Sequence, residues 1–187
     1  NTVDYLDVSN NNIADLTGIE KFAILTSLNC QDNQIASLNL TSNYILGFLN
    51  CSNNQLSHLD VMGLSSLWFL NCSNNNLTYL NVSGNTALQE FALYTNNLTS
   101  LYIVNNINLI DLKCDFNQIT NLDLSNNTNL THLYCAGNHI TSLDISLNST
   151  LIFLSCGSNP LTSIDLSNNL NLTHLDCFNS EITNLDL

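Results

Sequence analysis

Cysteines are the most reactive side chains in this sequence, and they recur at a fixed interval. Successive cysteines are 21 residues apart except for one interval of 42, and they stand at Cys30, Cys51, Cys72, Cys114, Cys135, Cys156 and Cys177. Leu93 occupies the skipped position, so the position accepts other apolar groups. Zinc sites usually need close C-x-x-C pairs, which this spacing does not provide. We therefore predict a column of reduced, buried cysteines that act as small hydrophobic residues and form no disulfides.

Two carboxylates and an imidazole also recur at this interval. Glu90, Asp111 and His132 are 21 residues apart, and together they could hold a divalent cation. Lys113 lies between Asp111 and Asp115 in the sequence, so an ion pair would account for the same charges without a metal. The ion pair is the interpretation that the residue types favour.

A nucleophilic triad could be assembled from Asp111, His132 and Ser155. The sequence contains no G-x-S-x-G, no H-E-x-x-H and no phosphate-binding loop. Repeats that stack into an open face also lack an oxyanion hole and a pocket that excludes water. We predict that the chain is not an enzyme.

An aspartate recurs at the same interval in the second half of each late repeat, at Asp123, Asp144, Asp165 and Asp186. On neighbouring rungs about 5 Å apart, two such charges repel by roughly 3 kcal/mol at an effective dielectric constant of 20. Bound calcium would relieve the repulsion. The favoured alternative is a turn-forming role, in which each carboxylate accepts hydrogen bonds from the serine two residues later (Ser125, Ser146 and Ser167).

All these positions belong to one repeat, L-x-x-L-x-C-x-x-N-x-L-x-x-L-D-L-S-x-N-x-x. Alternation around "LNC" and "LDV" predicts two short strands per unit, with neighbouring units about 4.8 Å apart. The asparagine three residues after the cysteine position is expected to point inward and bond to backbone groups at the bend. The loss of such a buried partner costs about 1–3 kcal/mol.

This pattern resembles the leucine-rich repeat. The 21-residue units look like the bacterial IRREKO-type subclass, and the first unit, "ADLTGIEKFAILTSLNC", resembles an internalin repeat. The resemblance implies a leucine-rich-repeat solenoid over residues 1–187, with stacked coils, two parallel β-sheets and little or no helix. It further suggests protein binding or adhesion by a bacterial cell-surface or secreted protein, and therefore an extracellular or cell-surface location.

Composition excludes several partners. The net charge is −13, and Lys21 and Lys113 are the only lysines in a chain without arginine, so neither nucleic acid nor an anionic membrane surface is an expected partner. No apolar run reaches the roughly 20 residues of a membrane span.

Because both ends of the sequence fall inside repeats without a polar cap, we expect a longer native chain or end-to-end self-association.

The outward positions that vary between repeats are where a partner would be selected. The middle repeats combine aromatic and charged residues there, which predicts a binding patch of Glu90, Tyr94, Asp111, Lys113, Asp115, Phe116, His132, Tyr134 and Phe153. The partner would be a protein or, through the aromatic residues, a surface glycan. Phe48, Phe69 and Phe153 could instead cover the core. A passive spacer and an ice-binding threonine array are further alternatives, although paired T-x-T rows are absent.

Overall fold

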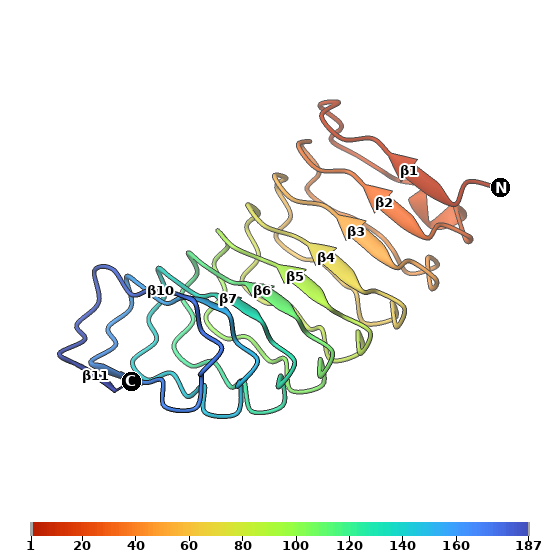
Figure 1. The fold of residues 1–187 in the computed structure, drawn as a ribbon. Coiled ribbons are helices and arrows are strands. Elements are labelled where there is room, and N and C mark those ends of the chain that lie inside the picture. Colours follow the sequence, from red (N-terminus) through yellow and green to blue (C-terminus); the bar gives the residue numbers. More distant parts are fainter. Residues whose placement is uncertain (1, 187) are drawn as a thin grey trace.

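The computed structural model describes residues 2–186, which coil into one continuous solenoid (Figure 1). Each coil contributes a three-residue strand, and the strands pair in parallel as a nine-stranded sheet, called here the first sheet. Its strands are β1 (Tyr5–Asp7), β2 (Ser27–Asn29), β3 (Phe48–Asn50), β4 (Phe69–Asn71), β5 (Glu90–Ala92), β6 (Asp111–Lys113), β7 (His132–Tyr134), β8 (Phe153–Ser155) and β10 (His174–Asp176). The pairing follows chain order, so the predicted solenoid is confirmed.

The register of the first sheet has no slip. Equivalent residues of successive repeats pair directly, as Phe91 of β5 does with Leu112 of β6. The middle residue of each strand points inward and is buried in β2 to β8, whereas its two neighbours lie on the outer face. Alternation with a period of two residues produces this arrangement.

A second, shorter sheet contains β9 (Ser163–Asp165) and β11 (Asn184–Asp186), again in parallel. In the earlier coils the equivalent L-x-L segments form no strand, although their apolar residues, such as Leu59 and Val61, are buried. Two parallel sheets are confirmed, but the second is confined to the last two coils. Within residues 2–186 the only helix is the 3-10 turn η1 (Ile19–Lys21), and no helix there could span a membrane.

The cysteines line the interior as predicted. All seven are free thiols, and every one except the half-buried Cys177 is fully buried. Burial raises the pKa of the Cys30, Cys72 and Cys156 thiols to about 12. A thiol that stays protonated in this way is a packing group and not a nucleophile.

The predicted asparagine column is also confirmed. In its fifth coil, Nδ2 of Asn96 donates to the carbonyl oxygens of Cys72 (3.1 Å) and Leu93 (3.0 Å), and Oδ1 accepts from the N–H of Leu77 (3.0 Å). Each side chain therefore joins its own bend to the preceding coil. The same role is taken by Asn33, Asn54, Asn75, Asn117, Asn138 and Asn159.

A second buried asparagine column, which was not predicted from the sequence, lies at the opposite bend. Nδ2 of Asn106 donates to the carbonyl oxygens of Val82 (3.0 Å) and Asn85 (2.9 Å) in the preceding coil, whereas its Oδ1 is buried without a partner. Leu64 takes this position in one coil. The column otherwise consists of Asn43, Asn85, Asn106, Asn127, Asn148 and Asn169.

Two glycines at equivalent turn positions differ in how closely the neighbouring coil approaches. A Cβ on Gly84 would lie 2.3 Å from the backbone oxygen of Met62, whereas one on Gly63 would lie 3.9 Å from the Tyr44 ring. We expect Gly84→Ala to lower the free energy of unfolding by about 1–3 kcal/mol, because backbone must shift. The matched Gly63→Ala should stay within about 0.5 kcal/mol. Equal effects in urea denaturation would contradict this prediction.

Candidate functional site

The first sheet brings the predicted binding residues together on its outer face. In-register pairing places Glu90, Asp111, His132 and Phe153 on four successive rungs. The remaining members lie on the same strands or directly after them, at Tyr94, Lys113, Asp115, Phe116 and Tyr134. These nine residues, called here the central patch, occupy four adjacent coils.

Lys113 is held by the residues around it. Its Nζ lies 3.0 Å from Oδ2 of Asp111 and 5.6 Å from the centroid of the Tyr134 ring. Partial burial lowers the pKa of Lys113, but the hydrogen bond and charge of Asp111, followed by the charges of Tyr134 and Glu90, together leave this pKa above its ordinary value. The predicted ion pair of Lys113 is confirmed, and its partner is Asp111. Within residues 2–186 no three His, Cys, Asp or Glu side chains are grouped to hold a metal ion.

Asp115 and Phe116 lie just beyond β6. Burial raises the pKa of Asp115, although its Oδ1 accepts a hydrogen bond from the N–H of Ala136 at 3.1 Å. Phe116 has a φ of 52° and is 60% exposed. Left-handed backbone is strained for a bulky residue, and other coils place residues such as Asn53, Asn74 and Gly137 here. Phe116 therefore places an exposed aromatic ring at a turn where the other coils carry smaller residues.

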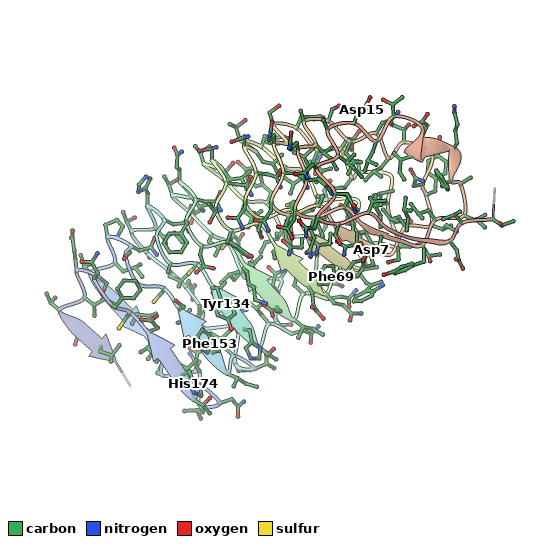
Figure 2. All side chains as sticks on the ribbon, turned by 90° about the horizontal axis from the view of Figure 1, so that it is seen from above. Asp7, Asp15, Phe69, Tyr134, Phe153 and His174 are labelled. Carbon is green, nitrogen blue, oxygen red and sulfur yellow. The ribbon has the colours of Figure 1, made fainter. Side chains whose placement is uncertain are left out.

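Aromatic rings stack along the face from coil to coil. The centroid of the Phe153 ring lies 4.6 Å from that of Tyr134, 6.3 Å from that of His132 and 5.9 Å from that of His174. Figure 2 labels Tyr134, Phe153 and His174 on successive strands of the first sheet. A second stack joins Phe48 and Phe69 at 4.4 Å, nearly parallel. Phe48, Phe69 and Phe153 are half-buried, so they both cover the strands and present ring surface to a partner.

The hydrogen bonds of His132 and Ser155 do not form the triad considered above. Oγ1 of Thr131 donates to the carbonyl of Ile110 at 3.1 Å and lies 2.9 Å from Nδ1 of His132. Ser155 Oγ is paired with Asp176 at 3.4 Å. Asp111, His132 and Ser155 therefore form no proton relay.

A hollow of about 340 Å³ opens on this face, and four members of the central patch are among the residues that line it. Ala92 is one of its lining residues and pairs with Asn71 and Lys113 on the neighbouring rungs. The lining residues are Phe69, Asn71, Glu90, Phe91, Ala92, Tyr94, Asp111 and Lys113. This hollow was not predicted from the sequence. Its only signal was a methyl side chain in a column that elsewhere carries larger groups.

The aspartates Asp123, Asp144 and Asp165, which lie outside the first sheet, take the turn-forming role that the sequence favoured over calcium binding. Hydrogen bonds from Ser125 lower the pKa of Asp123, and Ser146 and Ser167 do the same for Asp144 and Asp165. The backbone N–H of each serine donates to Oδ1 of the aspartate at 2.9–3.0 Å. The side chain of Asp186 lies outside the described part of the structure.

Comparison with known proteins places this geometry among solved solenoids. No protein-family model and no curated protein sequence matches the chain. A solved domain of InlJ from Listeria monocytogenes, described as including a cysteine ladder, is 40% identical over 99% of this chain, with a TM-score of 0.80. Internalin C2 from the same organism is 27% identical over 97% of this chain and 80% of its own, with a TM-score of 0.76.

YopM, a leucine-rich effector from Yersinia pestis, shows the same fold, with 23% identity over 98% of this chain and a TM-score of 0.83. The chain spans 46% of the InlJ chain and 51% of the YopM chain, so it covers about half the length of these two neighbours.

Proposed function

We propose that this chain, a leucine-rich-repeat solenoid similar in structure to internalins, is a non-enzymatic interaction module that binds a protein through the first sheet. The observation that carries the proposal is the central patch. There the stacked rings of Tyr134 and Phe153 lie next to the Lys113–Asp111 ion pair, on an extended face whose side chains differ from coil to coil. Such faces suit large partners, and aromatic residues dominate binding energy in interfaces. Adhesion at a bacterial cell surface, or outside the cell, is the corresponding role. We also assign the 21-residue units to the IRREKO-type subclass.

The aromatic stack is the part of the patch to test first. We expect the double variant Tyr134→Ala/Phe153→Ala to bind a partner at least about tenfold more weakly than wild type, because it removes the stack next to Lys113. The partner would come from a screen of arrayed bacterial and host surface proteins, and affinities would be measured by surface plasmon resonance. The affinity is also measured with added calcium and with a chelator, which tests whether calcium bound by the aspartate series contributes to binding.

The matched control is Tyr44→Ala/Tyr79→Ala, which removes two exposed rings outside the first sheet. Its affinity should stay within about twofold of wild type. If the control weakens binding as much as the patch variant, the first sheet is not the binding face. If no arrayed protein binds, a passive spacer becomes the better interpretation.

A surface glycan is the second candidate, favoured by the 60% exposure of Phe116 beside Asp115. An exposed ring can stack on a sugar ring, and a neighbouring carboxylate can accept hydrogen bonds from the sugar hydroxyls. Competition by free monosaccharides, together with loss of binding in Phe116→Ala, would support this candidate over a protein.

A further inference from the structure

The hollow above Ala92 is a gap in an otherwise filled column. The equivalent positions on the two neighbouring rungs carry Asn71 and Lys113, and only a methyl group lies between them. Its volume of about 340 Å³ is at the lower end of the range for small-molecule sites. A single long side chain from a partner would fit this space better than a folded loop.

Lys113 does not neutralise the hollow. Its ammonium is bound to Asp111 of the same strand at 3.0 Å and lies over the ring of Tyr134, on the following rung, at 5.6 Å. Glu90 is exposed, and no ion pair forms with it within the part of the chain that the structure describes. With Glu90 and Asp111 negative and Lys113 positive, the lining carries one uncompensated negative charge.

Two aromatic side chains complete the walls. Phe69 and Tyr94 both line the hollow and are half-buried. Phe69 is fixed from behind by Phe48, with ring centroids 4.4 Å apart and an interplanar angle of 9°. A cation between such rings gains from their negatively charged faces. Oδ1 of Asp111 is in addition buried without a hydrogen-bond donor.

We propose that this hollow receives an arginine side chain of the protein partner, which stacks between Phe69 and Tyr94 and bonds to Glu90. The inference rests on the proposed function, because it names the chemistry of a partner for the same face. Guanidinium is planar, permanently charged and forked, so it can stack on a ring and bind a carboxylate at once, whereas an ammonium group is compact and strongly hydrated. The net charge of −13 favours approach of a basic partner.

The direct test is NMR titration of the isotope-labelled chain with N-acetyl-arginine amide. We expect saturable shifts of the Ala92 methyl and Tyr94 amide signals, with a dissociation constant of about 1–10 mM. N-acetyl-citrulline amide, which has nearly the same shape without the charge, should give no saturable shift. Glu90→Gln should weaken binding about two- to fivefold, as expected for an exposed charge pair.

Ala92→Leu should abolish binding by filling the hollow, and its fold is checked by its amide spectrum. The control Glu181→Gln removes an exposed carboxylate outside the first sheet and should bind like wild type. Equal binding of arginine and citrulline probes, or no shift at about 50 mM arginine probe, would overturn the inference.

The screened partner separates this inference from the proposed function. A partner that loses affinity for Tyr134→Ala/Phe153→Ala but not for Ala92→Leu would overturn the arginine site and leave the binding face intact. A partner unaffected by either variant would overturn both.

Discussion

Asn96→Ala is expected to lower the free energy of unfolding by about 2–4 kcal/mol. The side chain is 7% exposed and bonds to the carbonyls of Cys72 and Leu93 and to the N–H of Leu77. Alanine would leave the N–H of Leu77 without a partner in an interior that water does not reach. The carbonyls of Cys72 and Leu93 would each lose one amide donor and keep another, from Asn75 and Asn117. The bonds cross between coils, so their loss also weakens the interface on which a solenoid depends. Equilibrium urea denaturation followed by circular dichroism would measure the change.

Asn97→Ala is the matched control, because it removes the same amide from an exposed neighbour. It should change stability by no more than about 0.5 kcal/mol. If Asn96→Ala lowered the free energy of unfolding no more than Asn97→Ala does, the inward asparagine column would not stabilise the fold.

Alkali is expected to unfold the chain cooperatively above pH 9, and the thiol column is the reason. Burial raises the pKa of the Cys30, Cys72 and Cys156 thiols from 9.0 to about 12, and it raises those of Cys51, Cys114 and Cys135 as well. Below pH 9 the thiols are protonated in both states. Above it the unfolded chain releases protons that the folded chain retains, so each buried thiol removes about 1.4 kcal/mol of stability per pH unit.

Replacing Cys72 with Val, a residue found at the equivalent position Val8, should reduce the slope of stability against pH by about 1.4 kcal/mol per unit between pH 9 and the folded pKa. The measurement is urea denaturation at several pH values. At pH 8 an aromatic disulfide reagent should label the half-buried Cys177 first and the other six only after unfolding. Rapid labelling of all seven in the native state would show that the column is not closed.

How far the sequence predicted the site depends on the residue. The rungs that carry Glu90, Asp111 and His132 follow directly from a spacing of 21 residues, because in-register parallel pairing converts equal spacing into adjacency. The partners of Lys113 do not follow in the same way. Asp111 and Asp115 are each two residues from it, and the choice of Asp111, with Tyr134 beneath the ammonium group, depends on the side-chain packing of the next coil.

The sequence by itself determined the period, the inward columns of leucine, cysteine and asparagine, and the parallel sheet, because each depends only on which residues repeat and on alternation along a strand. The tertiary structure decided features that depend on unequal neighbours. These are the hollow above Ala92, the partners of Lys113, and the limits of the second sheet. A repeat pattern describes the average coil, whereas a binding site is formed where adjacent coils differ in side-chain size and charge.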